Sequence, residues 1–294
     1  MVTSNEFDVS ISALPVVVPV TREQPVDSIA RAQVSLARLT ELVELAELLH
    51  TAEPYDVTPL DFDLPADFKL SIVIPVYNEE RTIREILARV AALPVPKEIV
   101  IVDDCSRDGT PEVLRELAQA SEVKVVFKQQ NEGKGAALRT GFEQATGSIV
   151  VVQDADLEYD PRDILKLLPP LLRGEADVVY GSRFLHQRPQ DKSAVHRLGN
   201  WLLTPASNVF TGLRITDMET CYKAFRRDVI QGLPIRQNRF GFEPEVTAKL
   251  ARRKCRVVEV PITYNARSFA EGKKIGIKDL FNALWCILRY GLAD

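Results

Sequence analysis

Apolar and polar positions alternate in blocks along residues 69–294. Short runs rich in Val and Ile, such as KLSIVIPV and EIVIVDD, are separated by stretches whose apolar residues recur every three or four positions. Continuous apolar runs are typical of strands buried on both faces of a parallel sheet, and the intervening period is that of helices. We therefore predict an α/β fold with strands at 69–76, 98–104, 123–128, 148–156 and 176–182, and helices at 79–92, 110–119, 133–145 and near 161–172.

Residues 1–68 follow a different pattern. They carry 12 acidic and 3 basic residues, a net charge of −9, whereas residues 69–294 carry 29 acidic and 34 basic residues, a net charge of +5. Within residues 27–50 the apolar positions recur at steps of three and four, which predicts a helix. That helix could pack on its own protein or self-associate, so a homo-oligomer stays open. We expect 1–68 to be an acidic extension with a helix and a linker, before a body that suits anionic ligands.

Several classes of protein are disfavoured by composition. The chain has no run of about 18 apolar residues and no basic segment followed by an apolar one at its start, so we predict neither a transmembrane span nor a secretory signal. Its 4 cysteines lie far apart without a CxxC pair, which argues against a disulfide framework and a thiolate zinc site. No basic and aromatic stripe suggests nucleic acid. We expect a cytoplasmic protein.

Acidic residues follow three of the predicted strands, in the segments PVYNEE (75–80), VDDCSRDGT (102–110) and QDADLEYDP (153–161). Because ligands of parallel sheets bind at the carboxyl ends of the strands, these segments should share one edge. Acids gathered there repel one another unless a cation or a hydroxyl-rich ligand is present. We expect Asp154, Asp156 and Glu158 to alternate along extended chain and to offer oxygen ligands to Mg²⁺ or Mn²⁺, with a substrate diphosphate completing the shell.

The segment NEGKGAALRTG (131–141) suits an anion. Gly133 and Gly135 allow a tight turn, and Lys134 places a cation beside the start of the next helix. The spacing is not that of a P-loop, and no GxGxxG follows the first strand, which weakens a dinucleotide interpretation.

Together with GSR (181–183), these segments resemble the inverting glycosyltransferases of family two, which have the GT-A fold. The chain is most similar to the dolichol- and polyprenyl-phosphate sugar synthases, over roughly residues 69–275. The resemblance implies a Rossmann-like, mostly parallel sheet flanked by helices. It also implies transfer of a hexose from a nucleotide sugar, GDP-mannose or UDP-glucose, to a polyprenyl phosphate with the help of Mg²⁺ or Mn²⁺.

The resemblance also implies roles for individual residues. Asp154 and Asp156 match the metal-binding DxD motif, and Glu158 stands where close relatives often have Gln. Arg183 matches an arginine that meets the acceptor phosphate, and Arg197 falls near a second one. Asp156, Asp217 and Arg183 are the expected catalytic residues, with Asp217 a base or a ligand of a sugar hydroxyl. Contacts to the nucleotide sugar are expected from Pro75, Tyr77, Glu79, Asp103, Asp104, Lys134, Asp154, Arg267 and Lys273.

Four questions stay open at this point. A phosphate acceptor is already an anion and needs placement, whereas a glycan or soluble hydroxyl acceptor needs a general base. A catalytically silent nucleotide-sugar-binding protein also fits the motifs. Glu243 and Glu245 could line the donor site or cap the helix that follows.

The C-terminal segment 276–294, which follows a glycosyltransferase domain at 69–275, is amphipathic. Residues 275–294 could pack on that domain or lie at the inner face of the membrane.

Overall fold

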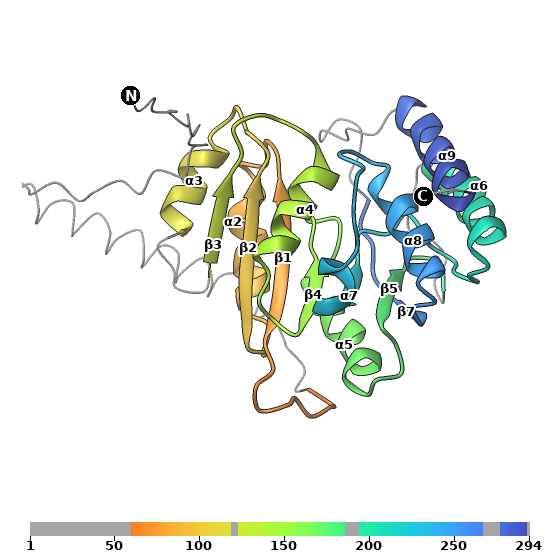
Figure 1. Cartoon of the computed structure of the whole chain (residues 1–294). Helices are drawn as coiled ribbons and strands as arrows, with labels where there is room; N and C mark the ends of the chain where they lie inside the picture. The colour runs from red at the N-terminus through yellow and green to blue at the C-terminus, as the bar shows by residue number, and fades with distance from the viewer. Residues whose placement is uncertain (1–59, 119–122, 186–193, 267–276, 293–294) are drawn as a thin grey trace, which may run out of the picture. The chain divides into compact units, whose positions relative to one another are not determined.

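A seven-stranded sheet runs through the part of the chain that the computed structural model describes, residues 60–118, 123–185, 194–266 and 277–292 (Figure 1). The helix predicted at 27–50 lies outside these residues. The strand order is β3-β2-β1-β4-β6-β5-β7. The strands are β1 (Leu70–Val76), β2 (Lys97–Asp103), β3 (Val123–Phe127), β4 (Ile149–Val152), β5 (Val178–Ser182), β6 (Lys223–Arg226) and β7 (Val257–Pro261).

Strand β1 lies inside the sheet because nearly all of its side chains are apolar and buried. It pairs in parallel with β2 on one side and β4 on the other. The register sets Val76 opposite Asp103 and Val73 opposite Val152. The carboxyl ends of these strands are therefore neighbours, as the sequence predicted.

Two features differ from the sequence prediction. Strand β6, which the sequence analysis did not predict, runs antiparallel to both β4 and β5, within a sheet that is mostly parallel as the resemblance implied. The strand predicted through residue 156 ends at Val152, and Leu157 has a left-handed φ of 61°. The expectation of extended chain was wrong here because the Asp156 carboxylate accepts a hydrogen bond from the Glu158 N–H (3.1 Å), which favours a turn.

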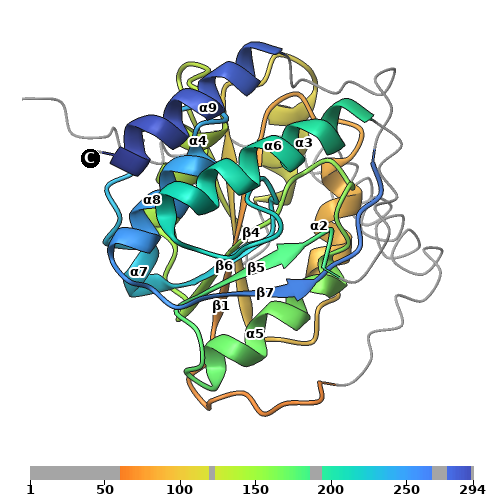
Figure 2. The same cartoon turned by 90° about the vertical axis from the view of Figure 1, so that its right-hand side faces the viewer.

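Helices cover both faces of the sheet. Helix α4 lies over β1 and β2 on one face, and α2 lies on the other (Figure 1). Beyond β6, helices α6, α8 and α9 pack on one another, on the side of the sheet opposite α5 (Figure 2). The helices are α2 (Ile83–Ala91), α3 (Thr110–Leu117), α4 (Lys134–Gln144), η1 (Pro161–Asp163), α5 (Ile164–Leu172), α6 (Ala194–Thr211), α7 (Arg227–Gln231), α8 (Phe242–Arg252) and α9 (Ile277–Leu292).

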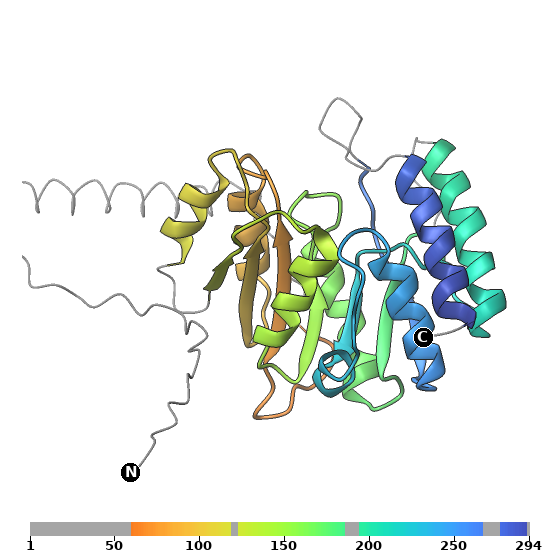
Figure 3. The same ribbon diagram turned by 45° about the horizontal axis from the view of Figure 1, so that its top comes forward.

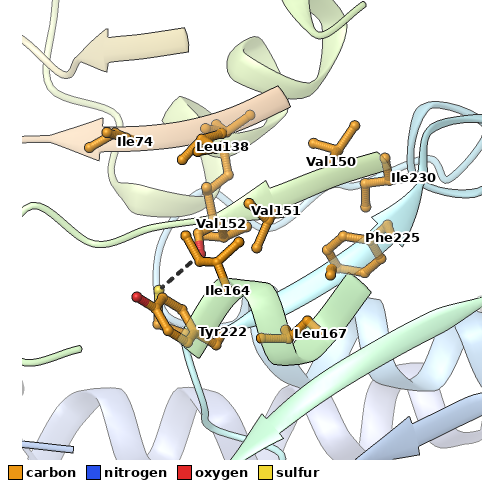
Figure 4. Close-up of a cluster of buried hydrophobic side chains, with 14 of the residues drawn as sticks. Ile74, Leu138, Val150, Val151, Val152, Ile164, Leu167, Tyr222, Phe225 and Ile230 are labelled. Carbon is orange, nitrogen blue, oxygen red and sulfur yellow. Dashed lines mark hydrogen bonds between the residues drawn. The ribbon is translucent and has the colours of Figure 1, made fainter. Parts of the chain in front are cut away.

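Strand β4 lies in the hydrophobic core, and all of its side chains are buried. Val150 and Phe225 are register partners on β4 and β6 and share one face of the sheet, and α5 contributes Ile164 and Leu167 to the same core (Figure 4). All four side chains are fully buried. This packing fixes the end of β4, from which the acidic turn at 154–158 departs.

Glu98 ties three segments together at the opposite end of the sheet. Its carboxylate accepts hydrogen bonds from Ser71 Oγ (2.5 Å), Thr146 N (2.6 Å), Thr146 Oγ1 (2.7 Å) and Lys69 Nζ (3.2 Å). Burial by itself would raise the pKa of Glu98, but the hydrogen bonds from Ser71 and Thr146 outweigh it and hold the pKa at about 2.

We expect Glu98→Gln to lower the free energy of unfolding by about 1–3 kcal/mol at pH 7, because it removes a charged acceptor from several donors. The pKa of Glu98 is lower in the folded chain, so its contribution is present above pH 4.5 and lost as the pH falls towards 2. Urea unfolding of both proteins across this range is the measurement. A difference that grows on acidification would contradict the assignment.

Candidate functional site

The loops after β1 and β2 are cross-linked. Asn78 N–H donates to Ser106 Oγ (2.9 Å), Arg107 N–H donates to Asn78 Oδ1 (2.8 Å), and Glu79 N–H donates to Thr110 Oγ1 (3.0 Å). Asn78 has a left-handed φ of 56°, which asparagine tolerates better than most residues. The predicted nucleotide-binding segment from Pro75 to Glu79 is thus held on a rigid frame.

Asp103 and Asp104 at the end of β2 are both buried and both bonded within the protein. The Asp103 carboxylate accepts from Ser106 N–H at 3.2 and 3.3 Å, and burial raises its pKa. Asp104 accepts from Gly133 N–H (2.6 Å) and pairs with Lys128 Nζ (3.0 Å). Asp104 therefore connects β2 to the Gly-Lys-Gly loop, and direct contact of either acid with a nucleotide stays a prediction.

The Gly-Lys-Gly loop is pressed against the segment before α8. A Cβ on Gly135 would meet the Gln237 carbonyl oxygen at 2.3 Å, and Gly133 has a φ of 103°. Glycine is required at both positions, for the close approach of two backbones at one and for a left-handed turn at the other. The start of α4 and the start of α8 are held side by side as a result.

Lys134 connects the Gly-Lys-Gly loop and the start of α8 to the acidic turn at residues 154–158. Its ammonium lies 2.9 Å from Asp154 Oδ1, 3.0 Å from Asp154 Oδ2 and 3.7 Å from Glu243 Oε1. Burial alone would lower the pKa of Lys134, but the charges of Asp154 and Glu243 outweigh it and raise the pKa. Lys134 therefore keeps a positive charge beside the place where a diphosphate is predicted.

The acidic turn offers a donor set that fits Mg²⁺ or Mn²⁺. Asp154 and Asp156 supply carboxylate oxygens, which these ions prefer, and such ions commonly take their other ligands from water and phosphate. No three His, Cys, Asp or Glu side chains converge as a metal site in the described residues. Glu158 is buried and accepts a hydrogen bond from Tyr264 Oη (2.6 Å). Metal binding by Asp154, Asp156 and Glu158 stays a prediction.

Arg183 and Asp217 form a clamp at the end of β5. Arg183 donates from Nε (2.7 Å), Nη2 (2.8 Å) and its backbone N–H (3.0 Å) to the Asp217 carboxylate, which is fully buried. The guanidinium also stacks over the Tyr264 ring, 5.1 Å from its centroid. Within the described residues, Nη1 of Arg183 donates to no acceptor. The Asp217 carboxylate therefore orients Arg183, and its role as a base or as a ligand of a sugar hydroxyl stays a prediction.

Tyrosines that the sequence analysis missed connect the acidic turn to this clamp. The Tyr159 ring lies 4.9 Å from that of Tyr222 and 5.1 Å from that of Tyr264, measured between centroids. Tyr159 Oη accepts from Cys221 N–H (3.2 Å), and Tyr222 Oη donates to Gln153 Oε1 (2.6 Å). The aromatic residues come from separate segments, so local spacing gave no signal for the group.

The two acids at the start of α8 have different roles. Gly241 is the N-cap, and no side chain caps the helix. Glu245 is fully buried and accepts from Arg236 N–H (2.8 Å), Gln237 N–H (2.6 Å) and Lys249 Nζ (2.7 Å). Glu245 supports the segment before the helix, whereas Glu243 faces Lys134.

Several predicted residues cannot be placed. Arg197 belongs to α6, but its side chain is outside the described residues, as are Arg267 and Lys273 altogether. Their roles stay predictions.

Comparisons with known proteins agree with this architecture. The family model for glycosyl transferase family 2 matches residues 71–233. An undecaprenyl-phosphate 4-deoxy-4-formamido-L-arabinose transferase of Aeromonas hydrophila is 33% identical over 226 residues, covering 74% of this chain and 67% of that protein. A dolichol-phosphate mannosyltransferase of Pyrococcus furiosus is 32% identical over 226 residues, covering 75% and 63%. The chain spans only about two thirds of the length of these relatives.

A solved structure shows the same fold. Glucosyl-3-phosphoglycerate synthase from Mycobacterium tuberculosis, in complex with Mn²⁺, UDP and phosphoglyceric acid, superposes with a TM-score of 0.59 at 22% identity. The match covers 78% of this chain and 80% of that one. At this identity the likeness shows the GT-A fold and nothing finer.

Proposed function

The chain belongs to glycosyl transferase family 2 and is a glycosyltransferase, and on that basis we propose that it transfers a hexose from a nucleotide sugar to a polyprenyl phosphate. The donor is GDP-mannose or UDP-glucose, and Mg²⁺ or Mn²⁺ is held by Asp154 and Asp156. The acceptor oxygen attacks the anomeric carbon from the side opposite the departing nucleoside diphosphate, so the configuration inverts.

The Arg183–Asp217 clamp is the observation that carries the acceptor half of this proposal. A phosphate monoester is an anion near neutral pH, so it needs a fixed cation rather than a base. Arg183 is oriented by a buried carboxylate that binds its Nε and Nη2. Its Nη1 would donate a hydrogen bond to a phosphate oxygen of the acceptor. The two relatives are named as transferases of undecaprenyl phosphate and dolichol phosphate, which supports a polyprenyl phosphate as the acceptor.

The donor half rests on the residues around β4. Lys134 places a positive charge beside Asp154, where charge develops on the leaving diphosphate. A bound divalent ion would stabilise the same charge as a Lewis acid. The cross-linked loops after β1 and β2 hold Tyr77 and Glu79 in place for the nucleotide.

We expect Asp156→Ala to reduce sugar transfer by about 100-fold, because the leaving diphosphate loses a group that neutralises it. The measurement is release of nucleoside diphosphate from GDP-mannose and UDP-glucose with Mn²⁺, with and without polyprenyl phosphate. Asp160→Asn is the control, because the Asp160 carboxylate binds Arg162 beside the acidic turn. Wild-type activity in Asp156→Ala would show that the metal assignment is wrong.

Arg183→Lys tests the acceptor. Lysine keeps the charge that Asp217 requires but loses the planar fork, whereas alanine would leave a buried carboxylate unpaired. We expect KM for polyprenyl phosphate to rise about tenfold, with KM for the nucleotide sugar unchanged. If KM rises equally for both substrates, a glycan or soluble acceptor is favoured instead. The same conclusion follows if Arg183→Lys transfers sugar to a sugar hydroxyl at the full wild-type rate.

We also propose that the chain contacts the membrane surface through residues 275–294. Helices α6 and α9 lie side by side (Figure 3). Helix α9 exposes Phe281 (65%), Trp285 (53%) and Leu292 (74%), and α6 exposes Trp201 (72%) and Val209 (80%). Of the large hydrophobic residues exposed in the described part of the chain, all but Phe127 lie on these two helices. None of the described helices has both the length and the apolar character needed to span a bilayer.

A lipid surface is the occupant that this face fits best. Tryptophan and phenylalanine favour the boundary between headgroups and acyl chains, and both residue types are exposed on α9. A surface-bound enzyme would also meet a polyprenyl acceptor where that lipid resides.

The double variant Trp201→Ser/Trp285→Ser should weaken binding to phosphatidylglycerol vesicles at least tenfold, because it removes two large apolar anchors. Vesicle co-sedimentation is the measurement, and Phe127→Ser is the control because Phe127 is an exposed aromatic residue on a strand. If the wild type does not bind vesicles but forms a dimer that the double variant disrupts, the exposed face of α6 and α9 is a self-association surface instead.

A further inference from the structure

Glu243 is a buried carboxylate with one oxygen unused. The residue is 5% exposed, and its Oε1 lies 3.7 Å from Lys134 Nζ. Its Oε2 is buried and accepts no hydrogen bond from the described residues. A buried carboxylate oxygen without a donor is costly, so the site is incomplete as the protein folds it.

Three other buried carboxylates of the region are satisfied by the protein itself. Asp104 binds Gly133 N–H and Lys128, Asp217 binds Arg183, and Glu245 binds two backbone N–H groups and Lys249. Glu243 stands in the first turn of the same helix as Glu245, yet only Glu245 is fully bonded. The difference points to a donor that a ligand brings.

The position of Glu243 indicates which part of a bound substrate could donate a hydrogen bond to its Oε2. Lys134 bridges Glu243 and Asp154, so Glu243 lies one side chain away from the turn proposed to hold the diphosphate. The phosphates themselves are acceptors and are repelled by a carboxylate. The sugar attached to them carries hydroxyl donors and is the nearest part of the donor substrate able to complete the site.

We propose that Glu243 is a sugar-binding residue whose Oε2 accepts a hydrogen bond from a hydroxyl of the transferred hexose. The inference rests on the proposed function, because it takes the nucleotide sugar as given and names the residue that recognises its sugar ring. A buried carboxylate discriminates strongly against a sugar that lacks the matching hydroxyl, because such a sugar leaves the oxygen unpaired.

Glu219 is a second acid of this region. Its Oε1 is also buried without a hydrogen-bond partner in the described residues. Burial and the charge of Glu243 raise the pKa of Glu219.

The experiment compares binding of the sugar with binding of the nucleotide. Calorimetry with Mn²⁺ measures Kd for UDP, UDP-glucose, GDP and GDP-mannose with the wild type, Glu243→Gln, Glu243→Ala and Glu245→Gln. We expect Glu243→Ala to weaken binding of the preferred nucleotide sugar by about tenfold or more, and to leave binding of the matching nucleoside diphosphate within about twofold. Glu243→Gln, which keeps an acceptor oxygen, should lie between. Glu245→Gln should lower Tm without changing the ratio of the two affinities.

Deoxy analogues of the preferred nucleotide sugar then identify the hydroxyl. One analogue should bind the wild type as weakly as the intact sugar binds Glu243→Ala, and should bind both proteins equally. If Glu243→Ala weakens the diphosphate and the nucleotide sugar by the same factor, or neither, the inference is overturned while the proposed function stands. If the wild type binds none of the four nucleotides, the proposed donor class fails and the inference fails with it.

Discussion

Charge compensation at the carboxyl end of the sheet is the constraint on which the rest of the structure depends. Parallel pairing of β1 with β2 and β4 brings acidic segments to one edge, where unpaired carboxylates would repel one another. Three carboxylates of this end of the sheet are held by specific partners: Asp104 by Lys128 and Gly133 N–H, Asp154 by Lys134, and Asp217 by Arg183. These pairs fix the loops, because each partner comes from a different segment of the chain.

The same pairs arrange the chemistry. Asp104 positions the Gly-Lys-Gly loop, the loop positions Lys134, and Lys134 lies between the acidic turn and Glu243. Asp217 orients Arg183 in the same manner at the end of β5. The residues proposed to bind charged substrates are thus held by residues of opposite charge, which would limit the reorganisation required when a substrate binds. Glu243 departs from this arrangement, since a partner within the protein satisfies only part of its carboxylate.

The sequence predicted the fold well where local pattern decides the structure. The apolar runs predicted β1, β2 and β5 within two residues at each end, because a strand buried on both faces must be continuously apolar. Strand β3, a partly exposed edge strand, was also predicted within one residue at each end. The prediction failed at 153–158, where a side-chain hydrogen bond from Glu158 N–H to Asp156 turned the chain. The antiparallel β6 was not anticipated, since strand direction depends on pairing partners and not on the strand's own residues.

For the site, the sequence by itself determined which residues carry charge and which strand ends they follow, because the parallel sheet makes that placement a matter of topology. It therefore predicted that Lys134, Asp154, Asp156 and Arg183 bind substrate or metal, and these roles, like those of Arg197, Arg267 and Lys273, stay predictions. Only the tertiary structure decided which acids are bonded within the protein and that one oxygen of Glu243 has no hydrogen-bond partner in the described residues. Glu243 and Glu245 are alike in sequence and differ only in the backbone and side chains that reach them across the fold.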